Sequence, residues 1–394
     1  MNTRATQDQP YRRDCRRPQA RRPMGRKLLL ALVSAVVASG ALAAQAMADS
    51  RTELDASLSR LVKLGAPGAM VYVRRDARTT RLARGLAVVA RRRPLRTADT
   101  FRIGSLTKTF VATVMAGLVT ESKLSLDDSV ESLLPGLVPG GESITIRQLL
   151  NHTSGIYDYE KDPRVLKPYL DGNLRYKWEP RDLVAIAASH KPLFTPGKRY
   201  DYSNTNYLIA GLAIEAVTGS PLPEQMQQRI FRPLALGRTA LQLSPKQDVP
   251  DMHGYLTLGR PPATDITGLS PYPWAAGAIT STIDEVARYY RALLGGRLVD
   301  PVMLRTMKTS VPEGPESDGF PGRRSGLGIE SFPTRCGTAW GHSGNFPGYL
   351  VYALTSANGK RQAILVVNQD PGSLPKSFGP MFIERLKRAY CGRE

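Results

Sequence analysis

Two pairs of residues in this 394-residue chain have the spacing S-x-x-K, which can make a serine nucleophilic. One pair is Ser105 and Lys108 in GSLTKTF, and the other is Ser373 and Lys376 in SLPK. A serine hydroxyl attacks well only when a base takes its proton, and residues three apart on a helix share one face. Pro375 disfavours a helix through the second pair. Ser105 is therefore the candidate nucleophile, with the alternative that it caps a helix beside an incidental lysine.

The residues after Ser105 predict a buried helix over about 106–119, because nearly all of them are apolar. Ser105 would then stand at the start of this helix, where free N–H groups and the positive dipole end favour a developing anion. Burial disfavours the charged form of a lysine. Lys108 is therefore a candidate for the base that takes the serine proton.

A second polar group, Tyr202-Ser203-Asn204, lies just before another predicted helix. A tyrosine near a lysine can act as a base, or as an acid toward a leaving group. The amide of Asn204 can bind a substrate carbonyl. The alternative is that this group is a polar turn that caps the helix.

A third group, His342-Ser343-Gly344-Asn345, follows Trp340-Gly341 and leads into an apolar strand. Its glycines would let a ligand lie against the strand edge. The backbone N–H groups of Asn345 and Ser105 are candidates for the two donors of an oxyanion hole.

The hydrophobic pattern places strands at both ends of the chain and helices between them. The predicted strands are 69–73, 80–89, 325–332, 348–355 and 361–368. The predicted helices are 50–64, 106–119, 181–188, 207–217, 282–294 and 380–390. This order predicts an α/β (α+β) fold with one antiparallel sheet built from both chain ends. We expect a sheet lobe of about 49–124 and 296–394, an all-helical insertion lobe of about 125–295, and a site at their seam.

The N-terminus is typical of an export signal. Residues 24–48 combine Arg26 and Lys27, an apolar run and the small residues of Ala46-Met47-Ala48. The run is too short and too rich in small residues for a membrane anchor. We expect cleavage near Ala48, a catalytic domain over 49–394, and a secreted protein. Met24 is our hypothesis for the true start.

Removing residues 1–48 lowers the net charge, because this segment holds nine basic and two acidic side chains. The remaining 45 basic residues are scattered among 32 acidic ones, so we expect no nucleic-acid partner. The same cut removes Cys15 and leaves Cys336 and Cys391. Two cysteines, an even number, in a protein exported to an oxidising compartment predict a disulfide between them. The alternative is two free buried thiols.

Together and in this order, the three polar groups resemble those of the serine penicillin-recognising enzymes, which comprise serine β-lactamases and penicillin-binding proteins. Tyr202 follows Ser105 by 97 residues, and His342 follows Tyr202 by 140. The Y-x-N and H-x-G forms resemble the class C branch and, more narrowly, secreted D-alanyl-D-alanine carboxypeptidases. GAPGAMV (65–71), TIRQLLNHTSGIYDY (145–159), Trp274 with Gly277, and GLGI (326–329) extend the resemblance over most of the chain.

The resemblance implies a β-lactamase/transpeptidase-like fold and a role for each matched residue. Ser105 would be acylated, and Lys108 and Tyr202 would share the proton transfers. Asn204 would hold the substrate amide, and His342 would help to position Tyr202 electrostatically. The remaining expected contacts are a substrate carboxylate at Ser343, beside Gly344 and Asn345, and a pocket wall at Trp274. No cofactor or metal is implied, since the four scattered histidines offer no ligand cluster.

Two positions depart from the family's carboxypeptidases, which usually have a threonine at the place of Asn345 and an arginine near Glu330. An acidic Glu330 would repel a substrate carboxylate if it pointed into the site. The sequence still predicts a D-Ala-D-Ala carboxypeptidase that acts on peptidoglycan stem peptides, with β-lactams as inhibitors or substrates. The alternatives are a β-lactamase, a D-aminopeptidase, an esterase or a non-catalytic wall-peptide binding protein.

Overall fold

The structure is a computed structural model that describes residues 51–392, except 248, 258–262 and 315–319. The predicted leader, its cleavage site and Met24 lie outside the described residues. Across the part of the chain that is described, every helix is too short or too polar to cross a bilayer.

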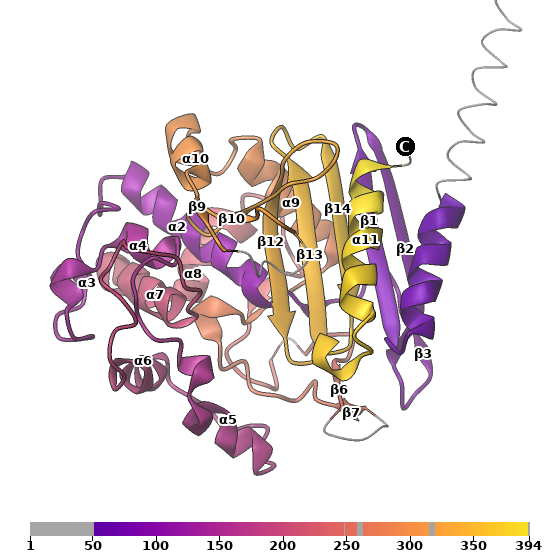
Figure 1. Cartoon of the computed structure of the whole chain (residues 1–394), viewed down its shortest axis with the longest axis horizontal. Helices are drawn as coiled ribbons and strands as arrows, with labels where there is room; N and C mark the ends of the chain where they lie inside the picture. The colour runs from indigo at the N-terminus through magenta and orange to yellow at the C-terminus, as the bar shows by residue number, and fades with distance from the viewer. Residues whose placement is uncertain (1–50, 248, 258–262, 315–319, 393–394) are drawn as a thin grey trace, which may run out of the picture. The chain divides into compact units, whose positions relative to one another are not determined.

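A nine-stranded antiparallel sheet is the centre of the fold, with the order β3-β2-β1-β14-β13-β12-β11-β10-β9 (Figure 1). Its strands are β1 (Gly68–Arg75), β2 (Arg78–Val88), β3 (Arg93–Pro94), β9 (Val311–Pro312), β10 (Arg324–Ser325), β11 (Glu330–Phe332), β12 (Ala339–Phe346), β13 (Tyr349–Ser356) and β14 (Arg361–Val367). Ala69 of β1 lies opposite Val367 of β14, so the two ends of the chain meet in mid-sheet. The predicted sheet from both chain ends is confirmed.

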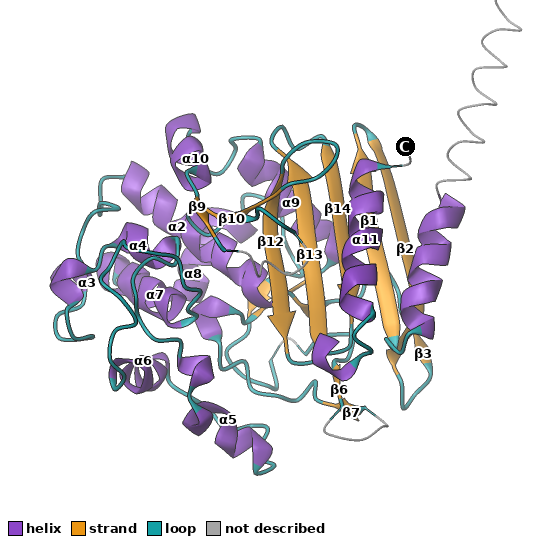
Figure 2. Ribbon diagram, in the orientation of Figure 1, coloured by secondary structure: helices purple, strands orange, loops and turns teal. Residues whose placement is uncertain are grey.

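Helices cover both faces of this sheet (Figure 2). In β13, Val351 belongs to the apolar core on one face, while Leu350 and Tyr352 belong to the core on the other. The second core includes Leu58 from the helix over residues 51–63 and Phe382 from α11 (Phe378–Cys391). Burial on both faces explains why these strands are continuous apolar runs in the sequence.

The segment between the two groups of strands is mainly helical. It contains α2 (Thr107–Thr120), α3 (Val130–Leu133), α4 (Ile146–Leu150), α5 (Pro163–Leu170), α6 (Pro180–Ala188), α7 (Thr205–Thr218), α8 (Leu222–Met226), α9 (Ile283–Leu294) and α10 (Pro301–Lys308). Short strands β4 (Phe101–Arg102), β5 (Ala240–Leu241) and β8 (Ile279–Ser281) form one small sheet, and β6 (Tyr255–Leu256) and β7 (Thr264–Asp265) form another. The insertion is therefore not purely helical, and α9 packs on the large sheet against β1, β13 and β14.

The strand predicted over 325–332 is broken in two. Gly326 N donates to Ile329 O at 2.8 Å, and Gly328 between them has a φ of +69°. A side chain at Gly328 would meet the Cβ of Ala112 on α2 at 2.4 Å. The GLGI segment is therefore a tight turn against the helix that follows Ser105, and β10 and β11 flank it.

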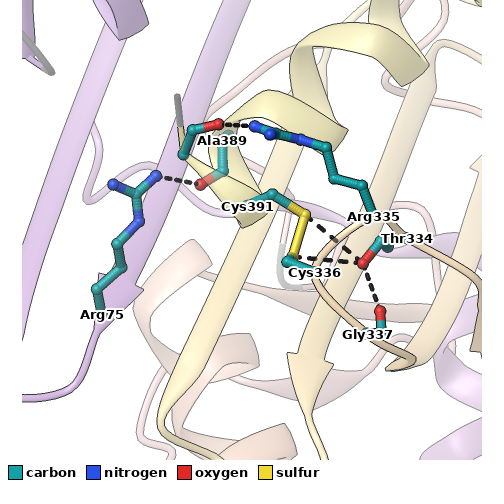
Figure 3. Close-up of a disulfide and its surroundings, with 8 residues drawn as sticks. Arg75, Thr334, Arg335, Cys336, Gly337, Ala389 and Cys391 are labelled. Atoms are coloured by element: carbon teal, nitrogen blue, oxygen red, sulfur yellow. Dashed lines mark hydrogen bonds between the residues drawn. A yellow bond between two sulfur atoms is a disulfide. The ribbon is translucent and has the colours of Figure 1, made fainter. Parts of the chain in front are cut away.

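The predicted disulfide is present between Cys336 and Cys391, whose Cα atoms are 5.6 Å apart (Figure 3). It joins the end of α11 to the loop before β12. Arg335 donates to the carbonyl of Gly392, and Arg75 on β1 donates to the carbonyl of Ala389 at 3.2 Å. The C-terminal helix is thus linked both to β1 and to the loop before β12.

Candidate active site

Ser105 lies in a tight helical turn, η1 (Gly104–Leu106), directly before α2. Gly104 has a φ of +53°, and a Cβ there would lie 2.5 Å from the carbonyl oxygen of Asn345. Only glycine fits such a backbone approach without strain. The glycine therefore brings Ser105 against β12, where the third polar group lies.

Lys108 points back from α2 toward Ser105, as the i, i+3 spacing predicts. Its Nζ lies 3.0 Å from Ser105 Oγ, 2.8 Å from Asn204 Oδ1 and 2.7 Å from the carbonyl oxygen of Ala276. Burial lowers the pKa of Lys108 to about 8, against the opposing effect of nearby carboxylates. A fraction of this lysine is therefore neutral near pH 7 and able to accept a proton.

Tyr202 and Asn204 come from the turn before α7, and both reach the same serine–lysine pair. The Tyr202 hydroxyl donates to Ser105 Oγ at 2.9 Å. Burial raises the pKa of Tyr202 well above its ordinary value, so the residue is a phenol rather than a phenolate. Neither Ser105 nor Asn204 makes a side-chain cap to the helix that follows it. Asn204 does occupy the N-cap position of α7, as the polar-turn alternative predicts, but without a side-chain capping bond, and Ser105 lies before the N-cap residue of α2, Leu106.

Two carboxylates that the sequence analysis did not select fix the amide of Asn204. Asp158 Oδ2 and Glu160 Oε2 each accept from Asn204 Nδ2 at 3.1 Å. Both hydrogens of the amide are thus used within the protein, and its oxygen faces Lys108. Asn204 also lines the cavity, and the prediction that it holds the substrate amide stays a prediction. The signal for these residues was the acidic DYE that follows HTSG in the segment 152–160.

Glu160 differs from Asp158 because it also lines the cavity beside Ser105. Burial, with a smaller effect from Asp158, raises the pKa of Glu160 to about 7. Among the residues that the structure describes, no ion pair joins Glu160 to an arginine or a lysine. A carboxylate of this kind is well placed to receive a cationic group from a ligand.

The His342-Ser343 pair lies on β12 and contacts Glu330 of β11. Glu330 Oε2 accepts from the backbone N–H of Ser343 at 2.9 Å, and its Oε1 lies 3.5 Å from His342 Nδ1. Burial lowers the pKa of His342, although Glu330 opposes this. The described contacts of His342 are to Ser343 and Glu330. The histidine ring that lies against Tyr202 is that of His152, which the sequence analysis did not select.

Glu330 does point into the site, since it lines the cavity, but it is not alone there. Arg323 Nη1 lies 4.0 Å from Glu330 Oε2 and donates to Ser343 Oγ at 3.4 Å. Glu313 forms an ion pair with the same guanidinium. An arginine therefore does stand near Glu330 in space, but it comes from the turn before β10, and two carboxylates accompany it.

The glycines of the third group serve the protein itself. A Cβ at Gly341 would lie 1.7 Å from the carbonyl oxygen of Ala353, and one at Gly344 would lie 2.3 Å from that of Ile103. Gly344 and Asn345 do line the cavity, as predicted. β13 and the segment before Ser105 therefore require these glycines, and the expectation that they also let a ligand lie against the strand stays a prediction.

Trp274 does not take the predicted place on the pocket wall. Its ring packs against α7, where a Cβ at Gly211 would meet it at 2.8 Å. Tyr272, Pro273 and Gly277 from the same turn line the cavity instead. The resemblance at Trp274 and Gly277 identified the turn that lines the cavity, but it could not show which way each side chain of the turn points.

These residues surround a cavity of about 1160 Å³ that extends from Ser105 to α11. Its charged lining comprises Glu160, Glu313, Glu330, Asp370, Glu384, Arg323 and Lys387. Carboxylates thus outnumber cationic groups among the described residues of the wall. Among all the residues that the structure describes, no group of three or more His, Cys, Asp or Glu side chains is placed to hold a metal ion.

The comparison with known families agrees with this geometry, because the model of the Beta-lactamase family matches residues 39–383. The chain belongs to the Beta-lactamase family. A solved D-stereospecific amidohydrolase from Streptomyces sp. is 35% identical, with a TM-score of 0.77 over 87% of this chain and 99% of that one. The family and fold class predicted from the sequence are confirmed.

Two further relatives carry different names. Penicillin-binding protein 4* of Bacillus subtilis is 26% identical over 73% of this chain and 64% of its own length. A D-aminopeptidase of Cereibacter sphaeroides is 26% identical over 80% of this chain and 60% of its own length. This chain thus spans less than two thirds of either relative.

Proposed function

We propose that this protein is a serine amidohydrolase that cleaves D-aminoacyl amides or peptides with a free α-ammonium group, through an acyl-enzyme on Ser105. The observation that carries the proposal is Glu160, a half-buried carboxylate in the cavity wall that contacts Asn204 beside the reactive pair. An amide substrate whose carbonyl lies at Ser105 would bring its α-ammonium toward this carboxylate. A charge-assisted hydrogen bond there would hold the substrate.

Lys108 has the geometry of the base that activates Ser105. Two of its three partners, Ala276 O and Asn204 Oδ1, can only accept hydrogen bonds. A neutral lysine would give its two N–H groups to these oxygens and turn its lone pair toward Ser105 Oγ. The serine proton would then pass to Lys108 as the oxygen attacks the substrate carbonyl.

Tyr202 has the complementary position and protonation state for an acid. Its hydroxyl points at Ser105 Oγ, so it lies close to the nitrogen that leaves when the amide bond breaks. Tyr202 would give its proton to that nitrogen and regain one from Lys108, which carries the serine proton. Water would then attack the acyl-enzyme by the reverse transfers and release the acid and Ser105. The oxyanion hole from the N–H groups of Ser105 and Asn345 stays a prediction.

The names of the relatives support an acyl group derived from a D-amino acid. The solved amidohydrolase is described as D-stereospecific, and one bacterial relative is a D-aminopeptidase. The predominance of carboxylates in the cavity wall points the same way, since it favours a cationic substrate over an anionic one.

A second candidate is the D-Ala-D-Ala carboxypeptidase predicted from the sequence, acting on peptidoglycan stem peptides. Arg323 favours it, because its guanidinium donates to Ser343 Oγ, where the substrate carboxylate would lie. Its charge is opposed by Glu313 and Glu330, which weakens attraction for a carboxylate. We therefore rank this function second. β-Lactams are expected to acylate Ser105 under either function.

The test compares four substrates on the wild-type chain and on Ser105→Ala. They are D-phenylalanine p-nitroanilide, its L-enantiomer, its N-acetyl derivative, and an N-acylated peptide that ends in D-Ala-D-Ala. We expect the highest kcat/KM for the free D-aminoacyl anilide and no activity in Ser105→Ala. Faster cleavage of the N-acetyl anilide would overturn the proposal, and faster cleavage of the D-Ala-D-Ala peptide would favour the second candidate.

We also propose that the enzyme works outside the cytoplasm after cleavage near Ala48. The leader-like sequence of residues 24–48 and the disulfide of the folded chain support this location. N-terminal sequencing of the protein secreted by a Gram-positive host should begin near Asp49. A retained N-terminus or an intracellular product would contradict the proposal.

A further inference from the structure

The ring of His152 lies flat against the ring of Tyr202, in the loop that follows α4. The ring centroids are 4.3 Å apart and the ring planes differ by 28°. Tyr207 and Tyr200 surround the same imidazole, with centroid distances of 5.4 Å and 5.8 Å. His152 is 2% exposed, so the imidazole forms the inner wall against which Tyr202 rests.

The imidazole is itself held on the segment that carries Tyr202. Its Nδ1 accepts from the backbone N–H of Ser203 at 3.2 Å and lies 3.4 Å from Asn206 Nδ2. Asn206 is fixed in turn, because its Oδ1 accepts from Ser154 Oγ at 2.7 Å. The His152 carbonyl accepts from Asp201 N at 2.9 Å. His152 therefore clamps the residues on both sides of Tyr202 as well as its ring.

We propose that His152 is the positioning residue for Tyr202: it fixes the plane of the phenol so that the hydroxyl points at Ser105 Oγ. The proposal rests on the Ser105 acyl-enzyme and on Tyr202 as the proton donor. His152 is absent from the described lining of the cavity and acts through Tyr202 rather than on the substrate. A tyrosine can swing about its Cα–Cβ bond, and the stacked ring with its clamp removes that freedom.

The protonation state of His152 agrees with this role. Burial, together with the charges of Lys108 and His342, holds the pKa of His152 well below its ordinary value. Because Nδ1 accepts from Ser203 N, the neutral ring carries its proton on Nε2. The ring can thus lie close to Lys108 without adding a second positive charge.

Two substitutions separate the ring from the clamp. His152 has a φ of +60°, a conformation that asparagine tolerates better than phenylalanine does. His152→Asn keeps the backbone and a hydrogen-bond acceptor but removes the stacked ring. His152→Phe keeps a ring but loses the acceptor and strains the backbone. His190→Asn is the matched control, because His190 also stacks on a tyrosine, Tyr157, with ring centroids 3.9 Å apart, and is absent from the described lining of the cavity.

The assay is kcat/KM for phenyl acetate and for p-nitrophenyl acetate, which reports acylation of the free enzyme. Phenolate is the poorer leaving group and needs the proton from Tyr202, whereas p-nitrophenolate leaves without it. General acid catalysis contributes about 10²–10⁴-fold. We expect His152→Asn to lose about 10-fold to 100-fold on phenyl acetate and less than about 3-fold on p-nitrophenyl acetate, with His190→Asn like wild type.

A purely structural role gives a different result. It would lower kcat/KM equally for the two esters. Activity would then follow stability, so His152→Phe would be both less stable and less active than His152→Asn. The positioning role instead predicts that His152→Phe melts at the lower temperature yet keeps more of the phenyl acetate activity. Equal losses on both esters, or the structural ranking, would overturn the proposal. If one variant does not fold, the ester ratio of the other decides.

The ester series also separates this proposal from the substrate class proposed above. Acetate esters carry no α-ammonium, so they make no charge-assisted contact with Glu160. A wild-type enzyme that cleaves the acetates but no D-aminoacyl anilide would refute the substrate class and leave the role of His152 testable. A wild-type enzyme that cleaves none of the esters would refute the acyl-enzyme and the role of His152 together.

Discussion

Glu160→Gln is the change that most directly tests how the cavity selects its substrate. The glutamine keeps an oxygen that can accept from Asn204 Nδ2, which now lies 3.1 Å from Glu160 Oε2. It removes only the negative charge. The variant should therefore fold and keep Asn204 in place, so that any change in activity reports the charge itself.

The expected loss applies to substrates with an α-ammonium. A hydrogen bond between charged groups contributes about 1.5–3 kcal/mol, and about 1.4 kcal/mol corresponds to tenfold in kcat/KM. Glu160→Gln should therefore lower kcat/KM for D-phenylalanine p-nitroanilide by about 10-fold to 100-fold. p-Nitrophenyl acetate has no ammonium group, and its plateau rate should change by less than about 3-fold, within ordinary context effects.

The same variant should also change how the rate of p-nitrophenyl acetate hydrolysis depends on pH, and this change favours activity. Glu160 raises the pKa of Lys108, which burial lowers to about 8. Removing the carboxylate lowers this pKa further, so more of Lys108 is neutral at a given pH. The acid limb of the p-nitrophenyl acetate profile should therefore move to lower pH in the variant, although the anilide is cleaved more slowly.

The assay is kcat/KM for both substrates across about pH 5 to 9, in the range where Lys108 and Glu160 titrate. Glu384→Gln is the control, because Glu384 also lines the cavity but is half-exposed on α11 and paired with Arg388 at 2.7 Å. Equal losses on both substrates would mean that Glu160 only supports the structure. An anilide rate like that of wild type would refute the ammonium site.

Three further predictions concern the base, the serine turn and the disulfide. Because Lys108 acts as the free amine, kcat/KM for p-nitrophenyl acetate should rise about tenfold per pH unit below about pH 8 and then level; a flat profile from pH 5 to 8 would contradict this. Gly104→Ala should cost about 2 kcal/mol in urea unfolding and lower kcat, because its Cβ would lie 2.5 Å from Asn345 O. Cys391→Ser opens a link across a sequence separation of 55, and its urea-derived stability should fall by about 4 kcal/mol with the kcat of the folded enzyme unchanged.

The sequence was most informative where one local rule determines geometry. The i, i+3 spacing put Lys108 on the face of α2 that reaches Ser105, and the observed distance is 3.0 Å. The apolar runs and turn residues located β1, β2, β13 and β14 to within two residues. The meeting of Ser105 with Tyr202 was predictable only from the resemblance, because no local rule joins positions 97 residues apart.

The residues that the sequence analysis missed lie in irregular segments. His152 lies in the loop after α4, and Glu160 lies in a single 3-10 turn, η3 (Tyr159–Lys161), which is too short for a periodicity that would indicate where a side chain points. Arg323 comes from the turn before β10 and reaches Ser343 only because β10, β11 and β12 are neighbours in the sheet. The turn that contains Trp274 does line the cavity, but the Trp274 side chain packs against α7 and not into the cavity. Side-chain direction in loops depends on tertiary packing, which the sequence pattern does not contain.

The pairing of β1 with β14 determines the order in which this protein can mature. Ala69 has no strand partner on that side until Val367 has been synthesised, so folding depends on contacts between residues far apart in the chain. A nascent chain that stops before Ala339 already contains Ser105, Lys108 and Tyr202 but lacks the β12 wall. Its unpaired β1 edge would attract chaperones or other chains. Hydrolytic activity should therefore appear late and all at once, after the C-terminal strands join the sheet.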